Sequence, residues 1–429
     1  MMFYKENDFK ETQIGRISKE WKVVKLEDSE VSSHIKSGST PAKNRADYWN
    51  GTIPFVTIGD MTKTVKYLYD TESKITEFAL KNSNTLLVPE NSILLSMYGT
   101  VGKIVINRIT TAISQNIAAI IPNRENVDAE FLHYALMHYS FQFKSAKIIT
   151  LKHLDIQMVK NAKIPLPPVE EQRAIAEVLG VVDSVIAKTG EVIAKTERLK
   201  KGLMQTLLTR GIGHKEYKQT PIGTIPKTWQ IVPLKTVVKS YKNGIYKPNK
   251  YYGRGYPCIR MYNIVEGRIN IANATLLDVT EQELEEYGLE PGDVVVNRVN
   301  TPELVGKAGV VPDGFGKATF ESKNIRIRLN REKLLPQFFS VFVQTTAYAK
   351  QVLSRAKIAV AQATITQNDL DSLLIPLPPT IDEQRKIADM VSKIDKKLEL
   401  ERGEKMRLER IKQGLMDLLL TGKIRVKVD

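Results

Sequence analysis

The chain has 429 residues, of which 42% are hydrophobic and 26% are charged, and it carries a formal net charge of +15. This length is enough for two or three domains, each with a core of its own, and the positive charge favours a polyanionic partner such as DNA. No apolar run reaches the length of a membrane helix, and the first ten residues are too polar for a secretory signal. The single cysteine, Cys258, excludes an internal disulfide and fits a reducing compartment, so we expect a cytoplasmic protein.

The chain contains an internal repeat of about 200 residues. Three pairs of segments match: IGRISKEWKVVKL (14–26) with IGTIPKTWQIVPL (222–234), IPLPPVEEQRAIAEVL (164–179) with IPLPPTIDEQRKIADMV (375–391), and GLMQTLLTRGI (202–212) with GLMDLLLTGKI (414–424). The middles, about 27–150 and 235–363, do not match. We interpret the matched ends as a scaffold and the middles as regions with different tasks, although an old duplication whose middles drifted would leave the same pattern.

The first variable stretch combines loop-forming and basic residues with short apolar runs. The segment SGSTPAKNRADYWNG (37–51), with the preceding Lys36, supplies Lys43, Arg45, Tyr48 and Trp49 for contacts with DNA. The runs IPFVTI, SILLSMYG and GKIVINR that follow it read as strands. The stretch therefore predicts an α/β domain in which a small sheet carries loops.

A long helix is predicted after the first IPLPP segment, which must be extended because of its prolines. Glu170 and Glu171 supply the acidic residues that suit a helix N-terminus. Apolar residues then recur with a period of 3.5 over about five heptads, which predicts a coiled coil. The two predicted contact rows are Ile175, Val182, Thr189, Thr196, Leu203 and Val178, Val185, Val192, Leu199, with Leu179, Ile186, Ile193 and Leu207 widening the stripe.

The second variable stretch begins with a basic, tyrosine-rich and glycine-rich segment, residues 240–262. It contains no acid and six tyrosines, together with Lys242, Lys247, Lys250, Arg254 and Arg260. Lysines can neutralise phosphates and arginines can bind base edges, so we interpret the segment as a DNA-contacting loop in preference to a solvated basic loop. The runs GDVVVNRV and NIRIRLN predict strands of a second α/β domain.

A second long helix is predicted after the second IPLPP segment. Its apolar rows are Ile387, Ile394, Leu408, Leu415 and Met390, Ile411, Leu418, interrupted by Lys397, Glu401 and Glu404. Because the register repeats with one offset, we expect the two helices to pack on each other and to act as a spacer between the domains. The charged interruptions leave open the alternative that each helix packs only on its own domain.

Motifs of catalytic chemistry are weak in this sequence. GTVGK (99–103) and GKAG (306–309) lack the spacing of a phosphate-binding loop, and the five histidines form no HExxH motif. Pro312-Asp313 followed by Glu321-Ser322-Lys323 mimics a PD…ExK nuclease site, but Asp-Gly after a strand is also an ordinary hairpin turn. The alternatives to a DNA-reading subunit are a stand-alone nuclease or methylase and a coiled-coil adaptor that binds only protein.

Two divergent modules, each followed by IPLPP, an (E/D)-E-Q-R segment and a long helix ending in GLMxxLLT, resemble the specificity subunit of type I restriction–modification enzymes. YGTVGK (98–103), SQN (114–116) and NRVNTPELVGKAGVV (297–311) are typical of the target-recognition domains of that family. The resemblance spans nearly the whole chain. It implies two globular α/β target-recognition domains, related by a pseudo-two-fold repeat and separated by two long helices that form an antiparallel coiled coil.

The resemblance also implies a function without catalysis by this chain. Each domain would read one half of a bipartite, asymmetric sequence in double-stranded DNA, and the helices would fix the gap between the halves. Two methylation subunits, which carry S-adenosylmethionine, would dock on the scaffold, and restriction subunits that translocate DNA can join them. The chain itself would bind no cofactor and no metal.

The expected boundaries and contact residues follow from the repeat, the basic loops and the resemblance. The domains are residues 1–163 and 211–374, and the spacer helices are residues 164–210 and 375–429. The helix-pairing residues are Ile175, Val182, Val185, Leu203, Ile387, Ile394, Leu408 and Leu415. The DNA contacts of the first domain are Lys36, Ser37, Gly38, Thr40, Lys43, Arg45, Tyr98, Gly99, Thr100, Lys103, Gln115 and Asn116. Those of the second are Lys242, Tyr246, Lys247, Lys250, Arg254, Arg260, Arg298, Asn300, Thr301, Lys307 and Asn324.

Overall fold

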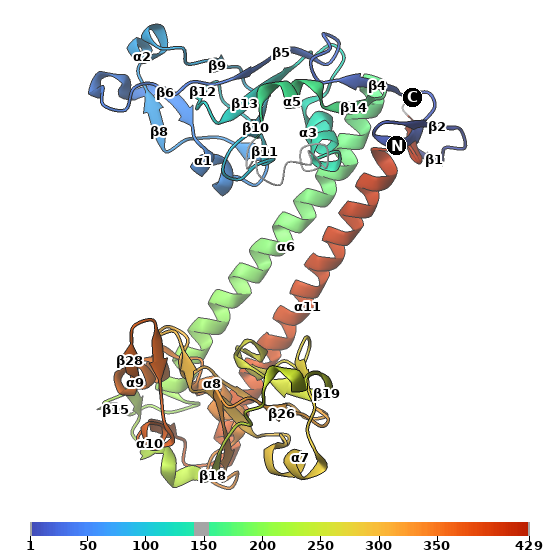
Figure 1. The fold of residues 1–429 in the computed structure, drawn as a ribbon. Coiled ribbons are helices and arrows are strands. Elements are labelled where there is room, and N and C mark those ends of the chain that lie inside the picture. The colour runs from blue at the N-terminus through green and yellow to red at the C-terminus, as the bar shows by residue number, and fades with distance from the viewer. Residues whose placement is uncertain (1, 141–153, 428–429) are drawn as a thin grey trace. The chain divides into compact units, whose positions relative to one another are not determined.

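The computed structural model describes residues 2–140 and 154–427, which form two compact units (Figure 1). Unit 1 comprises Met1–Gly190 and Gly403–Asp429, and unit 2 comprises Glu191–Arg402. Two long helices, α6 (Val169–Arg210) and α11 (Ile381–Leu419), each contribute one part to either unit. The domain boundaries expected from the sequence stay predictions, and the first variable stretch ends at Thr150, outside the described residues.

The domain of unit 1 is built on two sheets. The five-stranded sheet has the order β5 (Ser32–Ser37), β13 (Ile117–Pro122), β10 (Ile93–Ser96), β11 (Ile104–Asn107), β7 (Tyr67–Leu68). The four-stranded sheet has the order β8 (Ser73–Ile75), β6 (Trp49–Val56), β12 (Thr111–Ile113), β9 (Leu87–Val88). The helical segments are η1 (Ala46–Tyr48), α1 (Ile58–Lys63), α2 (Glu77–Asn82), α3 (Ala129–His138) and α5 (Ile156–Asn161). Strands β10 and β11 are buried along their whole length, as their continuous apolar sequences require.

The domain of unit 2 repeats this plan. Its six-stranded sheet has the order β18 (Val238–Asn243), β27 (Asn324–Leu329), β23 (Val294–Asn297), β25 (Ala308–Val310), β21 (Gly267–Ile269), β20 (Ile264–Val265). Its second sheet has the order β22 (Thr275–Leu277), β19 (Tyr252–Ile259), β26 (Thr319–Phe320), and a third joins β24 (Val299–Asn300), β29 (Gln362–Thr364), β28 (Lys357–Ala359). The helical segments are η2 (Leu234–Val237), η3 (Asn249–Tyr251), η4 (Met261–Asn263), α7 (Glu281–Tyr287), α8 (Pro336–Phe342), α9 (Thr346–Arg355) and α10 (Gln367–Asp371). The variable middles therefore share a fold although their sequences differ, which confirms the predicted pair of α/β domains.

Short strand pairs join the repeated segments of the sequence. In unit 1, β4 (Lys22–Lys25) pairs with β14 (Lys163–Leu166), and in unit 2, β17 (Gln230–Pro233) pairs with β30 (Leu374–Leu377). Two hairpins precede them: β2 (Phe9–Thr12) with β3 (Gly15–Ser18), and β15 (Tyr217–Thr220) with β16 (Gly223–Pro226). In unit 1, β1 (Met2–Lys5) also pairs with β31 (Ile424–Lys427).

A buried glutamate at the start of each long helix holds the tryptophan of the same repeat. In unit 1, the indole N–H of Trp21 donates to Glu171 Oε2 at 3.2 Å, and in unit 2, that of Trp229 donates to Glu383 Oε2 at 3.2 Å. Both tryptophans are fully buried. A buried indole N–H and a buried carboxylate each require a partner, and here each satisfies the other.

The glutamine that follows each glutamate binds the residue before a helix of the sheet domain, α3 in unit 1 and α8 in unit 2. The Gln172 amide accepts from the Asp128 N–H at 3.0 Å, directly before α3, and the Gln384 amide accepts from the Leu335 N–H at 2.9 Å, directly before α8. Gln172 also donates to the Asn126 carbonyl, and Gln384 to the Lys333 carbonyl. The repeated Trp and Glu-Gln residues thus bind each long helix to its domain in both units.

The two long helices pack antiparallel in each unit. In unit 1, Ile175 and Leu179 of α6 lie in one buried cluster with Leu419 of α11, and in unit 2, Leu207 of α6 lies in one cluster with Ile387 of α11. Early residues of one helix therefore meet late residues of the other, which confirms the predicted antiparallel coiled coil. No helix in the described ranges is both long enough and apolar enough to span a bilayer.

Most of one predicted contact row faces outward in each helix. Val185, assigned to helix pairing, is 43% exposed, and Val192, Leu199, Met390 and Ile411 also face outward. The inward positions, here called the seam, follow one another at alternating intervals of four and three residues. They are Ile175, Leu179, Val182, Ile186, Thr189, Ile193, Thr196, Lys200, Leu203, Leu207 in α6 and Ile387, Val391, Ile394, Leu398, Glu401, Lys405, Leu408, Lys412, Leu415, Leu419 in α11. The other predicted pairing residues, Val182 and Leu203 among them, are buried or half-buried seam residues.

The seam admits lysines because the opposite helix supplies acids. In unit 1, Lys412 Nζ lies 2.7 Å from Asp183 Oδ1, and in unit 2, Lys200 Nζ lies 2.7 Å from Asp395 Oδ1. The second contact is an ion pair without hydrogen-bond geometry at Oδ1. Lys200 and Asp395 are about nine-tenths buried, and each also has a second ionic partner: Lys200 Nζ lies 3.7 Å from Glu266 Oε2, and Asp395 Oδ2 accepts from Arg268 at 2.9 Å.

We predict that Asp395→Ala destabilises the protein by about 3 kcal/mol, because it removes the nearer of the two acidic partners of the buried Lys200 and also the acidic partner of Arg268. Denaturant unfolding followed by circular dichroism measures this effect. The control is Glu191→Ala, which removes an exposed partner of Lys195 on the same helix and should cost less than about 1 kcal/mol. Equal losses of stability in the two variants would show that the Lys200–Asp395 pair stabilises the protein no more than an exposed ion pair does.

A buried histidine predicts a pH dependence of unit 1. Burial, followed by the charges of Lys66 and Lys412, lowers the pKa of His133 from 6.5 to about 3. The unfolded chain therefore binds one more proton than the folded chain as pH falls from about 6.5 towards 3. The free energy of unfolding should decrease over this interval, by up to about 1.4 kcal/mol for each pH unit.

The measurement is the urea midpoint at pH 7.5 and at pH 5.5. His133→Leu should lose less stability between these values than the parent protein, whereas His34→Leu, at an exposed position of β5, should behave as the parent. The same loss in all three proteins would contradict the assignment.

Candidate nucleic-acid interface

In each domain, a loop that contains a glycine crosses the end of a strand, and the two crossings are at equivalent places. A Cβ on Gly38 would lie 2.0 Å from the Ile113 carbonyl oxygen, and one on Gly244 would lie 2.1 Å from the Glu321 carbonyl oxygen. Only glycine allows these approaches. The loops after β5 and β18 are thus held against the residues that follow β12 and β26, so the two domains present equivalent faces made of different side chains.

In unit 1 this face carries a groove of about 540 Å³. Four residues that the sequence suggested for DNA contact, Thr40, Lys43, Trp49 and Asn116, line it. The other lining residues are Phe55, Thr57, Ile58, Gly59, Ser73 and Ser114. Thr57 was missed because a lone hydroxyl at the end of a strand carries no signal in the sequence, whereas Ser114 lies in the SQN segment but was not itself assigned a contact.

The loop between β10 and β11 lies beside this groove. Gly99 has φ +70°, and a Cβ there would lie 3.5 Å from Ile58 Cγ2 on the groove wall. Tyr98 and Thr100 are exposed, and the Thr100 hydroxyl lies 3.4 Å from that of Thr62. Lys103 is turned inward: its ammonium donates to the Val65 carbonyl at 3.2 Å, and burial lowers its pKa.

The remaining predicted contacts of unit 1 are exposed but differ in their pairing. Gln115 lies between the groove residues Ser114 and Asn116, while Lys36 and Ser37 are exposed on β5. Arg45 donates to both carboxylate oxygens of Asp47 and lies over the Tyr48 ring, 4.7 Å from its centroid. Its charge is therefore largely compensated within the chain.

The basic loop of unit 2 is less free than its sequence indicates. Lys247 donates to Glu283 at 2.5 Å, Arg254 to Asp278 at 2.9 Å, and Lys242 to Glu286. These acids lie on α7 and in the segment before it, more than twenty residues along the chain, so the absence of acids within the loop was misleading. Tyr246, which is 80% exposed, and Lys250 remain at the surface.

Asn324 does not belong to the DNA-facing surface. Its side chain is fully buried, its amide donates to the Ile259 carbonyl at 3.0 Å, and its oxygen accepts from Asn297 at 3.1 Å. Asn297, which the sequence did not single out, also accepts from Asn300 at 2.8 Å. This chain of amides positions the loop that carries Asn300.

The other predicted residues of that loop lie nearer the surface. Thr301 is exposed, whereas Lys307 and Arg298 are half-buried. The Arg298 backbone N–H donates to the Lys323 carbonyl at 2.8 Å, and the Asn300 amide lies 3.5 Å from Met261 Sδ. These contacts join the loop to the turns that follow β19 and β26.

Arg260 is bound to Glu321, which belongs to the nuclease-like pattern. Arg260 Nε donates to Glu321 Oε2 at 2.9 Å, and the glutamate side chain is 7% exposed. A carboxylate that is already paired with a guanidinium is a poor metal ligand. Within residues 2–140 and 154–427, no three acids, histidines or cysteines come together in a way that could hold a metal ion.

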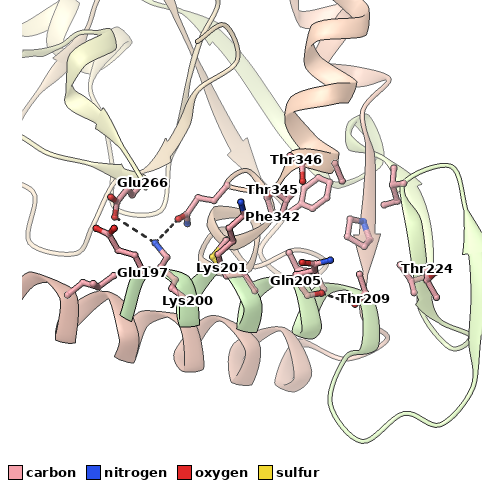
Figure 2. Close-up of a pocket in the computed structure, with 18 of the residues that line it drawn as sticks. Glu197, Lys200, Lys201, Gln205, Thr209, Thr224, Glu266, Phe342, Thr345 and Thr346 are labelled. Carbon is pink, nitrogen blue, oxygen red and sulfur yellow. Dashed lines mark hydrogen bonds and ion pairs between the residues drawn. The ribbon is translucent and has the colours of Figure 1, made fainter. Parts of the chain in front are cut away.

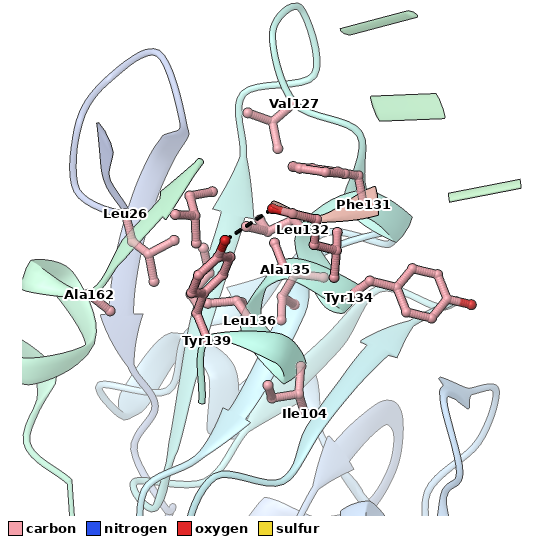
Figure 3. Close-up of a cluster of buried hydrophobic side chains, with 14 of the residues drawn as sticks. Leu26, Ile104, Val127, Phe131, Leu132, Tyr134, Ala135, Leu136, Tyr139 and Ala162 are labelled. Atoms are coloured by element: carbon pink, nitrogen blue, oxygen red, sulfur yellow. Dashed lines mark hydrogen bonds between the residues drawn. The ribbon is translucent and has the colours of Figure 1, made fainter. Parts of the chain in front are cut away.

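A second cavity, of about 670 Å³, lies in unit 2 between α6 and the end of α8 (Figure 2). Lys200 at its edge donates to Gln344 at 2.9 Å, while Gln205 and Leu208 line it. In unit 1, the residues at the corresponding positions, Asp417 and Leu420, contact the end of α3. His138 Nδ1 lies 3.5 Å from Asp417 Oδ1, and the Tyr139 hydroxyl donates to the Leu420 carbonyl at 3.0 Å from within the buried cluster (Figure 3).

The two units differ at this place: the helix positions that line a cavity in unit 2 contact the end of α3 in unit 1. None of the predicted DNA contacts lines the cavity. Neither Arg260 nor Glu321 is among its lining residues, and we do not assign it to the nucleic-acid interface.

Comparison with known proteins places these features in a family. The model of the type I restriction modification DNA specificity domain matches the chain twice, at residues 18–198 and 226–410. The specificity subunit of the type I restriction enzyme MjaVIII from Methanocaldococcus jannaschii is 32% identical over 435 residues, which cover 100% of this chain and 98% of that subunit. The EcoKI specificity subunit of Escherichia coli is 26% identical over 238 residues, or 54% of this chain and 50% of that subunit.

Solved structures share the fold. One chain, from a study of complex assembly and conformational transition of the type I R-M system, aligns with a TM-score of 0.59 at 19% identity, covering 95% of this chain and 99% of that chain. The type I restriction–modification S subunit from M. genitalium aligns with a TM-score of 0.54 at 15% identity, covering 94% and 96%. Because the family model matches both repeats and a relative is similar along its whole length, this chain belongs to the family of DNA specificity subunits of type I restriction–modification systems.

Proposed function

We propose that the two domains read the two halves of a bipartite, asymmetric target in double-stranded DNA. The observation that carries this proposal is that one frame occurs twice with different side chains at the same positions. In unit 1 the residues that follow the paired strands β6 and β12 are Thr57 and Ser114, and in unit 2 they are Arg260 and Glu321. Equivalent faces with unlike chemistry suit unlike base sequences.

In this proposal, the long helices fix the gap between the half-sites. A helix extends by about 1.5 Å per residue, so its length defines a distance, and ion pairs in the seam fix how the helices are registered. Lys412 with Asp183 in unit 1 and Lys200 with Asp395 in unit 2 provide such pairs.

The outward faces of the helices support docking of two methylation subunits. Val192 and Leu199 of α6 are 43% and 63% exposed, and Met390 and Leu400 of α11 are 41% and 74% exposed. Apolar side chains that face water in a row favour burial against a partner. We assign S-adenosylmethionine to those methylation subunits and no catalytic activity or cofactor to this chain, which acts in the cytoplasm and can be joined by restriction subunits.

The module assignment predicts the outcome of an exchange. If residues 27–150 are replaced by the corresponding segment of another specificity subunit, one half of the methylated sequence should change while the other half stays. Mapping of methylated bases in cells that express the exchanged complex provides the measurement. The reciprocal exchange of residues 235–363 is the control and should change the opposite half, whereas a change in both halves would contradict independent reading.

The docking assignment predicts the effect of a charge on the outer helix face. Leu199→Glu should reduce co-purification of the methylation subunits at least tenfold, because it places an acid on the exposed apolar row. The fold should stay intact in circular dichroism, because the side chain does not contact the seam. Lys195→Glu, at a polar exposed position one turn earlier, is the matched control, and equal co-purification of the two variants would count against docking at this row.

A further inference from the structure

The positions that follow the paired strands carry side chains of different chemistry in the two domains. Strand β19 pairs in parallel with β26, and β6 pairs in parallel with β12. The Glu321 N–H donates to the Ile259 carbonyl at 3.1 Å, just as the Ser114 N–H donates to the Val56 carbonyl at 3.0 Å. Arg260 and Glu321 in unit 2 are therefore the structural equivalents of Thr57 and Ser114 in unit 1.

In unit 1 the equivalent residues lie at an open groove. Thr57 and Ser114 both line the 540 Å³ groove, and the Thr57 hydroxyl is engaged by Asp60 at 2.6 Å. In unit 2 an arginine and a glutamate take these places. The glutamate is buried, whereas the arginine side chain is 36% exposed. Where unit 1 has two hydroxyl side chains, unit 2 thus has a guanidinium that reaches the surface from a buried acid.

The Arg260 guanidinium is held on one edge only. Its Nε is bonded to Glu321 Oε2 at 2.9 Å, and its two terminal nitrogens make no hydrogen bond to a residue in the described part of the chain. The ring centroids of Tyr252 and Tyr262 each lie 5.8 Å from its Cζ. These contacts restrict the rotamers of a long side chain and lower the entropy lost on binding.

The backbone beneath Arg260 is fixed as well. Its N–H donates to Asn263 Oδ1 at 3.0 Å, and its carbonyl accepts from the Asn263 N–H at 2.9 Å. The residues predicted to contact DNA lie around it: Asn300 contacts Met261, and Ile245, next to Tyr246, bridges to Glu321. The guanidinium therefore lies within the proposed recognition face of unit 2.

We propose that Arg260, positioned by Glu321, reads a guanine in the half-site of unit 2. A guanidinium whose terminal nitrogens are free donates two parallel hydrogen bonds to guanine O6 and N7, and no other base offers two acceptors there. The proposal rests on the proposed function. Glu321 is a positioning residue, because it contacts the arginine and acts on DNA only through it.

The test uses the complete complex with its methylation subunits and a duplex that carries its mapped target. The half-site of unit 2 is identified by the exchange of residues 235–363, and each guanine in it is replaced in turn by 7-deazaguanine, which lacks the N7 acceptor. The parent complex should lose about 5- to 100-fold in affinity at one position. Arg260→Ala should lose a similar factor on the normal target and become indifferent to the 7-deaza substitution at that position.

Two further variants separate reading from folding and from charge. Glu321→Gln keeps the size of the side chain but weakens its hold on Arg260, so it should reduce the preference for guanine at that position without changing non-specific binding. Arg331→Ala removes an exposed arginine of the same unit that is not among the predicted DNA contacts and donates to the Pro291 carbonyl, and it should retain the full sensitivity to 7-deazaguanine.

The outcomes distinguish the two proposals. If the parent complex shows no sequence preference, the proposed function fails. If the parent is specific but the half-site of unit 2 contains no guanine, or Arg260→Ala keeps the sensitivity to 7-deazaguanine, the reading of guanine by Arg260 is overturned.

Discussion

A carboxylate buried at the start of each long helix is the constraint on which the rest of the structure depends. Glu171 in unit 1 accepts from the indole of a tryptophan 150 residues earlier in the chain, and Glu383 in unit 2 accepts from one 154 residues earlier. In unit 1 the same carboxylate also binds Arg425, and in unit 2 it binds His214. Since a buried carboxylate is costly without such partners, the helix, the first strands and the segment after the other helix must come together at one point. The sheet domain is then attached by the neighbouring glutamine.

The helix pair shows how polar residues define a register. An apolar seam can slide by a turn with little penalty, whereas a lysine moved away from its aspartate would be left uncompensated. Lys200 and Lys412 occupy equivalent seam positions, and Asp395 and Asp183 are their equivalent partners. The duplication thus produces two ion pairs from one ancestral arrangement, one in each unit, and leaves the outer apolar row of the helices for other proteins.

The recognition faces of the two domains share a backbone frame but differ in their side chains. Gly38 and Gly244 hold the same loop in the same place, because only glycine fits against the strand end. Around them the side chains diverge: hydroxyl groups that line a groove in unit 1, and a guanidinium held by a buried acid in unit 2. One backbone frame can therefore carry two specificities, as the substitution of a few side chains at the strand ends changes the donors and acceptors presented to a base pair.

The sequence alone determined the duplication, the two α/β domains and the existence of the two long helices, because these depend on local patterns: proline-bounded segments, acidic helix starts and a 3.5-residue period. Their antiparallel pairing was expected from the family resemblance. The sequence did not determine which apolar row faces inward. Val185 and its row are as hydrophobic as the true seam, and Lys200 and Lys412 become inward residues only because an aspartate of the other helix lies opposite. The same reason explains the recognition faces. Asn324 is buried, and Lys247 and Arg254 are neutralised, by partners that are distant in the chain and near in space, and only the tertiary structure decides such proximity.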